Sequence, residues 1–179
     1  MTMLLLKEVP KYECLLESSR RYPELDPSAM EAFLHLMRTS TELSEGFDTL
    51  HASHNISHGR FIVLMLLNRD PEKPVNLADL ADRSTVTRAT MTGLIDTLER
   101  DGFVKREHTL DDRRMMLVRL TAEGRSYFDK ILPDYFRRVA AVMSQLTVAE
   151  QKTLVTLMGK IQQTMPTILP GPLSKSTAA

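Results

Sequence analysis

The segment Val75–Phe103, VNLADLADRSTVTRATMTGLIDTLERDGF, limits the fold of this chain more than any other part of the sequence. Two residues suited to N-capping, Asn76 and Thr87, each precede a short run with the apolar spacing of a helix. Gly102 follows the second run, where a helix favours a left-handed residue. The apolar positions are Leu77, Leu80 and Ala81 in the first run and Met91, Leu94, Ile95 and Leu98 in the second. The pattern predicts two short helices joined by a tight turn through 83–86, a helix-turn-helix.

A β-hairpin is predicted immediately after this motif. Phe103–Glu107 is typical of a strand, and His108–Asp112 is typical of a turn. In the segment 115–120, Met116, Val118 and Leu120 alternate with Met115, Leu117 and Arg119, and this period of two predicts the second strand. Thr121 is then a suitable N-cap for a further helix. A helix-turn-helix followed by such a hairpin is a winged helix.

Long amphipathic helices are predicted on both sides of the winged helix. The first begins near Asp26, which can be its N-cap with Pro27 in the first turn. Alternatively, Ser28 can be the N-cap, with Glu31 three residues later. Apolar residues then recur at steps of three and four as far as Leu50. A break at 55–57, a buried helix at 61–67 and a loop at 68–74 follow, and a short helix is predicted earlier, at 12–20.

Two helices are predicted after the hairpin. The helix that starts at Thr121 has an apolar face that extends to Met143, and Pro133 is expected to kink it. The sequence TVAE at 147–150 is a capping box for a last helix, which carries apolar residues as far as Met165. The residues from 166 to 179 are rich in Pro, Ser and Thr, which favours a flexible tail.

Composition narrows the class of protein without identifying a partner. The 23 basic and 23 acidic residues cancel, so only a local cluster of charge could mark a nucleic-acid site. Cys14 is the single cysteine, which excludes an internal disulfide and a four-thiolate zinc site. The apolar run near the N-terminus is too short for a membrane span or signal peptide. We therefore expect a cytoplasmic protein without a membrane partner.

The stretch LADRSTVTRATMTGLIDTLERDGFVKREHTLDDRRMMLVRLTAEG resembles the turn, recognition helix, wing and wing exit of the multiple-antibiotic-resistance regulator (MarR) family. The resemblance implies a mainly α fold, in which long N- and C-terminal dimerisation helices flank a winged helix-turn-helix. On this basis the chain has an N-terminal extension at 1–25, a MarR-like domain at 26–165 and the tail at 166–179. Within the domain, the winged helix is expected at about 57–120 and the dimerisation helices at about 26–54 and 121–165. Ser84 departs from the family, which usually has a buried aliphatic residue there.

The resemblance implies that this chain binds double-stranded DNA. The recognition helix would place its N-terminal polar residues in the major groove. At the wing tip, an Asp-x-Arg pair falls on Asp112 and Arg114, where the carboxylate can orient a guanidinium for the minor groove. Arg113 would contact a phosphate, and Asp111 would form the turn. The expected recognition-helix contacts are Thr87, Arg88, Thr90 and Thr92. Further cations expected to face phosphates or solvent are Arg83, Lys105, Arg106 and Arg119.

The family's architecture further implies a homodimer that represses transcription from a pseudo-palindromic operator until a small ligand releases it. The family's ligand pocket suggests four candidate contacts. Arg38 would suit a carboxylate and Phe61 an aromatic ring, with His58 and Met65 beside them. For Phe61 and Met65 a plain core role is the favoured alternative.

The sequence also contains residues that could support other functions. His51, His54 and His58 have a spacing that metal ligands can have, but the break at Asn55 separates them, so we expect no metal site and partly exposed histidines. Cys14 could sense peroxide, although a partly buried, inert thiol is favoured. A DNA-binding protein without any ligand is the remaining alternative. No catalytic motif or cofactor-binding motif is present, so neither an enzyme nor a cofactor is expected.

Overall fold

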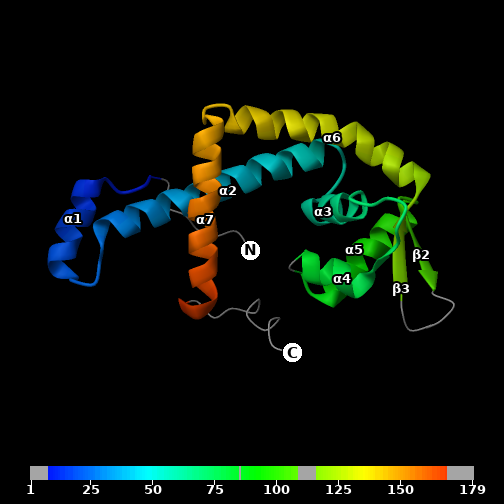
Figure 1. Cartoon of the computed structure of the whole chain (residues 1–179), viewed down its shortest axis with the longest axis horizontal. Coiled ribbons are helices and arrows are strands. Elements are labelled where there is room, and N and C mark those ends of the chain that lie inside the picture. Colours follow the sequence, from blue (N-terminus) through cyan, green and yellow to red (C-terminus); the bar gives the residue numbers. More distant parts are fainter. Residues whose placement is uncertain (1–7, 85, 109–115, 169–179) are drawn as a thin grey trace. The chain divides into compact units, whose positions relative to one another are not determined.

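The computed structural model describes residues 8–84, 86–108 and 116–168. Contacts within the chain divide it into two compact units, Met1–His58 and Gly59–Ala179 (Figure 1). Each unit is described by itself below. No helix among the described residues is both long and apolar enough to cross a lipid bilayer.

The first unit consists of two helices, α1 (Tyr12–Arg21) and α2 (Pro27–Ser53). The Asp26 carboxylate caps α2 by accepting hydrogen bonds from the backbone N–H groups of Ser28 at 2.9 Å and Ala29 at 3.1 Å. Pro27 occupies the first helical position, where its missing N–H costs nothing. The first of the two predicted caps is therefore confirmed, and both helices begin where the sequence predicted.

The end of α2 is a fully formed Schellman motif. Asn55 takes the left-handed conformation with φ of 55°, which asparagine tolerates better than most residues. The N–H of Ile56 donates to the carbonyl of His51 at 3.0 Å, and the N–H of Asn55 donates to that of Ala52 at 3.0 Å. Ile56 and Leu50 are both buried beside these bonds, which is the apolar contact that usually accompanies the motif. The predicted break at 55–57 is thus a specific, hydrogen-bonded turn.

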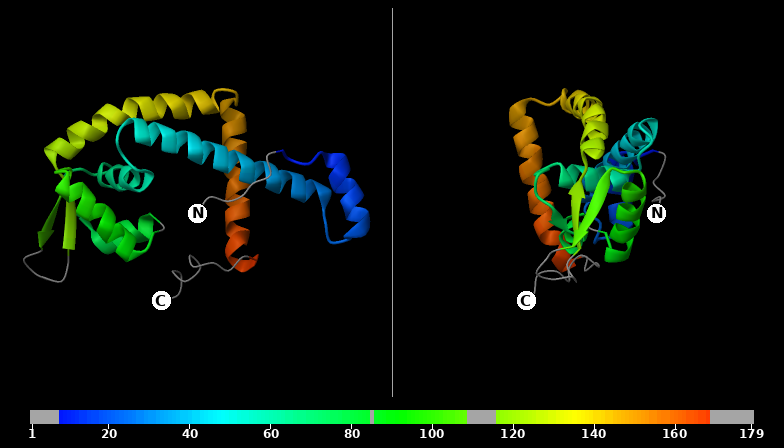
Figure 2. Two further views of the ribbon diagram at one scale, coloured as in Figure 1. Left: turned by 180° about the vertical axis from the view of Figure 1, so that it is seen from behind. Right: turned by 90° about the vertical axis from the view of Figure 1, so that its right-hand side faces the viewer.

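The second unit contains the winged helix and two long helices. Its sheet is antiparallel in the order β1-β3-β2. Val118 of β3 lies opposite Val75 of β1 on one side and opposite Arg106 of β2 on the other. Both views in Figure 2 show β2 and β3 side by side. The elements are α3 (His58–Leu67, which starts at the last residue of the first unit), β1 (Val75–Asn76), α4 (Leu77–Arg83), α5 (Arg88–Arg100), β2 (Val104–His108), β3 (Met116–Leu120), α6 (Ala122–Met143) and α7 (Val148–Ile168).

An aromatic cluster joins α3 to α6. The Phe61 ring is 1% exposed and lies 5.3 Å from the Phe128 ring and 4.8 Å from the Tyr135 ring, measured between centroids. Such tilted pairs contribute about 0.5–1.5 kcal/mol beyond the burial of their area. Val63, Leu64 and Leu67 continue the same core, so α3 is the buried helix that the sequence predicted.

The exit from the hairpin is locked by contacts between the start of β2 and the start of α6. The Thr121 hydroxyl donates to the carbonyl of Gly102 at 2.7 Å and accepts from the N–H of Gly124 at 2.9 Å. Gly102 has φ of 77°, the left-handed conformation expected after a helix. A Cβ on Gly124 would lie only 2.0 Å from the carbonyl oxygen of Phe103, so no larger residue fits there without movement.

The C-terminal helices follow the prediction with one correction. Thr147 and Glu150 form the predicted capping box, in which the N–H of Thr147 donates to the Glu150 carboxylate at 2.7 Å. Helix α6 continues through Pro133, and Figure 1 shows it as a bowed helix. Helix α7 reaches Ile168, so residues 166–168 are helical rather than part of a tail. Pro166 has no N–H to donate to the carbonyl four residues earlier, so the last turn of α7 lacks that hydrogen bond. The rest of the expected tail lies outside the described residues.

Candidate nucleic-acid interface

Helix α5 is oriented by a buried stripe on one face. Met91, Ile95 and Leu98 follow one another at steps of four and three, and all three are 0% exposed. Fixing three apolar side chains in the core fixes the rotation of the helix about its own axis. The opposite face, which begins with Thr87 and Arg88, is therefore held toward solvent.

The first turn of α5 presents a polar surface. Thr87 is the N-cap, and its hydroxyl accepts from the N–H of Thr90 at 3.1 Å. The Thr87 and Thr90 hydroxyls are also 2.9 Å apart, and the Thr92 hydroxyl donates to the carbonyl of Arg88 at 2.9 Å. All four side chains are exposed, and no ion pair to Arg88 is found among the described residues. Arg88 is therefore the side chain in this turn with the most donors available to a partner.

The turn between α4 and α5 explains the unusual residue at position 84. Ser84 is half-buried at the C-terminus of α4, and its hydroxyl donates to the carbonyl of Leu80 at 2.6 Å. The same carbonyl also accepts from the backbone N–H of Ser84 at 3.1 Å. The Ser84 side chain thus adds a second hydrogen bond at this helix end, where an aliphatic residue would contribute packing.

The structure shows ion-pair partners within the fold for three of the four additional cations. The guanidinium of Arg106 forms ion pairs with Asp96 and Glu99 of α5. The backbone N–H of Arg106 also donates to the Glu99 carboxylate at 2.9 Å. Lys105 lies 2.8 Å from Glu107, and this hydrogen bond lowers the pKa of that carboxyl. Both cations therefore pair with carboxylates of their own unit, and the Arg106 side chain is 20% exposed whereas that of Lys105 is 56% exposed.

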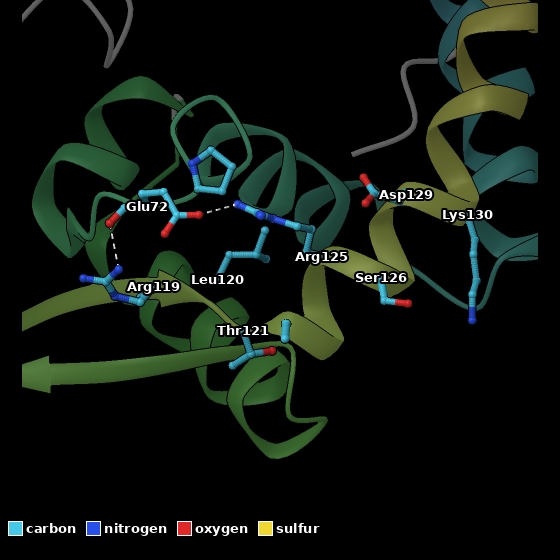
Figure 3. Close-up of a pocket in the computed structure, with 10 residues that line it drawn as sticks. Glu72, Arg119, Leu120, Thr121, Arg125, Ser126, Asp129 and Lys130 are labelled. Atoms are coloured by element: carbon cyan, nitrogen blue, oxygen red, sulfur yellow. Dashed lines mark hydrogen bonds and ion pairs between the residues drawn. The ribbon is translucent and has the colours of Figure 1, made fainter.

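Arg119 is the third cation that acts within the fold. It donates to the backbone carbonyl of Glu72 at 2.7 Å, while the Glu72 carboxylate pairs with Arg125 of α6 at 3.0 Å (Figure 3). These groups border a cavity of about 590 Å³. Glu72 thereby ties the loop before β1 to both β3 and α6. Arg83 remains exposed, without an ion pair among the residues that the structure covers.

The wing tip itself lies outside the described residues. Strand β2 ends at His108 and β3 begins at Met116. Asp112, Arg113 and Arg114 fall in the segment that joins these strands, and their predicted DNA contacts stay predictions. The two strands that carry this segment pair in register from Val104 opposite Leu120 to His108 opposite Met116, so the predicted hairpin is confirmed.

The four candidate ligand contacts fall in two different units. Arg38 pairs with Glu42 one turn along α2, with 2.7 Å between Nε and the carboxylate oxygen, and His58 is exposed at the start of α3. Phe61 belongs to the aromatic core, and Met65 is half-buried on the same helix. The core role favoured for Phe61 as an alternative is the role that the structure shows.

Two expectations about exposure were wrong. His51 is 1% exposed rather than partly exposed. Burial is the largest cause that lowers the pKa of His51, and the nearby charge of His58 lowers it further. Asp48 raises this pKa, and His54 lowers it. Cys14 is exposed on α1 rather than partly buried. In both cases helix rotation sets the exposure, and the local sequence around each residue did not indicate it.

Comparison with known proteins agrees with this architecture. The MarR family model matches residues 56–116. The HTH-type transcriptional repressor YetL of Bacillus subtilis is 36% identical over 156 residues, which cover 87% of this chain and 93% of YetL. The regulator YkoM of the same organism is 34% identical over 133 residues, which cover 74% of this chain and 84% of YkoM.

Solved structures show the same fold. Sco3205, a MarR family regulator from Streptomyces coelicolor in complex with DNA, superposes with a TM-score of 0.74 at 24% identity, covering 83% of this chain and 94% of Sco3205. BpsR of Bordetella bronchiseptica is a protein whose DNA binding is regulated by 6-hydroxynicotinic acid. It superposes with a TM-score of 0.61 at 25% identity, covering 72% of this chain and 96% of BpsR. The shared winged helix-turn-helix and the extended match to YetL lead to one assignment: this chain belongs to the MarR family of helix-turn-helix transcriptional regulators.

Proposed function

We propose that this protein is a repressor that binds a pseudo-palindromic operator as a homodimer and is released from it by a small ligand. The observation that carries the proposal is the first turn of α5, where Arg88 and Thr90 are exposed on a helix whose other face is buried. An arginine there can donate two hydrogen bonds to guanine, and a threonine can contact a base edge or a thymine methyl group. Thr87 and Thr92, whose hydroxyls are engaged within the helix, would contribute by shape.

The wing would add a contact in the minor groove. A narrow minor groove has an enhanced negative potential, which attracts a guanidinium. We assign this contact to Arg114, with Asp112 accepting from part of its donor fork and Arg113 at a phosphate. Since Lys105, Arg106 and Arg119 are paired inside the fold, the wing tip, Arg83 and Arg88 would carry most of the positive charge that faces DNA.

Dimerisation is supported by apolar surface that the single chain leaves exposed. None of the residues of α7 is buried. Five of its exposed apolar residues lie at steps of three and four, which places them on one stripe. Exposure of this kind on consecutive turns of a helix marks an interaction surface. The stripe consists of Leu154, Leu157, Ile161, Met165 and Ile168.

Release by a ligand requires that the ligand bind the free conformation more tightly than the DNA-bound one. A small aromatic or anionic compound is the class we propose, and the relation to BpsR, which responds to 6-hydroxynicotinic acid, supports it. Arg38, His58, Phe61 and Met65 are the candidate contacts that we propose for it.

The test is footprinting of the DNA upstream of the protein's own gene, with and without aromatic acids, combined with gel-shift titrations of two matched variants. Arg88→Ala removes a cation at the N-terminus of α5. Arg100→Ala removes one from the other end of the same helix, where the side chain is 75% exposed and 3.8 Å from Asp101. Both variants change the net charge equally, so they separate a specific contact from general electrostatic attraction.

We expect Arg88→Ala to lose about 1–3 kcal/mol of specific binding, roughly 5- to 150-fold in affinity, and Arg100→Ala to bind nearly as well as the wild type. Equal losses in both variants would show that α5 does not place its first turn in the groove. A protected operator that no aromatic acid releases would leave the DNA-binding part intact and contradict the ligand part.

A further inference from the structure

Three metal-ligating side chains converge at the turn between α2 and α3. Asp48 and His51 are three residues apart on α2, so they lie on one face of the helix a turn apart. His58 is the first residue of α3, and its ring centroid lies 5.2 Å from that of His51. One ligand atom from each of the three residues lies within 4.8 Å of the other two. All three belong to the first unit, Met1–His58.

The chain between the two helices is held in a defined conformation. The Schellman motif closes on His51, whose carbonyl accepts from the N–H of Ile56, and Asn55 supplies the left-handed residue. This arrangement returns the chain beside the last turns of α2. His58 therefore reaches His51 because of a hydrogen-bonded turn, and the break that seemed to separate the histidines is what brings two of them together.

We propose that Asp48, His51 and His58 form a binding site for a divalent transition-metal ion, with Zn²⁺ as the test case. Two imidazoles and one carboxylate are ligands that zinc and its neighbours in the first transition row accept. Mg²⁺ and Ca²⁺ prefer sites made wholly of oxygen, so they fit this set poorly. Three protein ligands leave at least one coordination position for water or a small anion.

The geometry requires only a small contraction. Atoms at the corners of a triangle with 4.8 Å sides lie about 2.8 Å from its centre, whereas zinc binds nitrogen and oxygen at about 2.0–2.2 Å. Each ligand atom would move inward by roughly 0.6–0.8 Å. Asp48 and His58 are exposed and can rotate, while the buried His51 provides a fixed ligand. His54, which lies on the same turn, is not part of the group.

The experiment measures metal binding to the untagged, full-length protein after treatment with a chelator. Zn²⁺ is titrated in competition with a chromophoric chelator, and Co²⁺ is added separately because its visible spectrum reports coordination by imidazole and carboxylate. The variants are His58→Gln and Asp48→Asn, which alter exposed side chains, with circular dichroism to verify the fold. His54→Gln is the matched control, because it removes an imidazole from the same turn but not from the group.

We expect one Zn²⁺ per chain in the wild type and in His54→Gln. His58→Gln and Asp48→Asn should each bind zinc at least about 10- to 100-fold more weakly. Loss of a residue that only hydrogen-bonds to a metal ligand typically costs that much affinity, and loss of the ligand itself should cost no less. Excess Mg²⁺ or Ca²⁺ should not displace the zinc. The proposal is overturned if the wild type binds no zinc, if His58→Gln binds as tightly as the wild type, or if His54→Gln loses as much as His58→Gln. No DNA enters the measurement, so its outcome is independent of the proposed function.

Discussion

Replacing Gly124 by alanine tests whether the hairpin exit is as tightly packed as the structure shows. The added Cβ would lie 2.0, 2.8 and 2.9 Å from the carbonyl oxygen, carbonyl carbon and Cα of Phe103. Because all three are backbone atoms, no rotamer change can relieve the contact. The start of α6 must instead move away from the start of β2 by about 1 Å.

That movement would weaken two hydrogen bonds. The N–H of Thr121 donates to the carbonyl of Phe103 at 3.1 Å, and its hydroxyl proton is shared between this oxygen, at 3.1 Å, and the carbonyl of Gly102, at 2.7 Å. Overpacking costs about 1–3 kcal/mol, and each weakened bond about 0.5–1.5 kcal/mol. The higher helix propensity of alanine returns at most about 1 kcal/mol. The net expectation for Gly124→Ala is a loss of roughly 2–4 kcal/mol in the free energy of unfolding.

Gly93→Ala provides a control of opposite sign. Gly93 lies inside α5, in the same unit, and a Cβ there would meet nothing within 4 Å. This variant should gain about 0.5–1 kcal/mol from helix propensity alone. Urea denaturation followed by circular dichroism, at one fixed protein concentration, measures both changes. If Gly124→Ala is as stable as Gly93→Ala, the close approach to Phe103 does not exist in solution.

Four further predictions concern function and assembly. Asp112→Ala should weaken operator binding in a gel shift at fixed salt, because Arg114 loses its orienting carboxylate; simple charge attraction predicts tighter binding, and that result would refute the pairing. Light scattering at micromolar concentration should report a dimer for the wild type and a monomer for Leu157→Glu, and a dimeric variant would place the interface elsewhere. Burial lowers the pKa of His51 below its usual 6.5, so the folded state takes up its proton at a lower pH than the unfolded state. In the presence of a chelator, stability should therefore fall as pH decreases below about 6.5, and an equally steep fall in His51→Gln would contradict this assignment. Cys14→Ser should respond to peroxide as the wild type does, and loss of a response that the wild type shows would make Cys14 a sensor.

The helix boundaries were predictable from the sequence because their causes are local. Asp26, Thr87 and Thr121 each accept a hydrogen bond from an N–H two or three residues ahead, and Gly102 supplies a left-handed residue directly after α5. Such interactions need no distant partner, so a short stretch of sequence indicates them reliably. The family resemblance added the winged-helix topology, which periodicity alone leaves less certain.

The roles of charged side chains were less predictable. Arg106 and Arg119 occur beside the predicted wing, and cations at such positions are typical of a phosphate-binding surface. Arg106 pairs with Asp96, ten residues earlier, and Arg119 contacts the backbone of Glu72, 47 residues earlier. A count of charges cannot show that these cations are neutralised by partners from other elements. Fewer of the cations beside the wing are therefore without a partner in the fold than the sequence suggested.

By itself, then, the sequence determined where helices begin and end, which faces of them are apolar, and that a hairpin follows two short helices. Tertiary structure alone decided that His51 is buried, that the Phe61 ring packs against Phe128 and Tyr135, and that Asp48 stands beside His51 and His58. The reason is physical. Caps and periodicity depend on residues within about one helical turn, whereas burial and convergence depend on how each helix is rotated and on how the chain turns between helices.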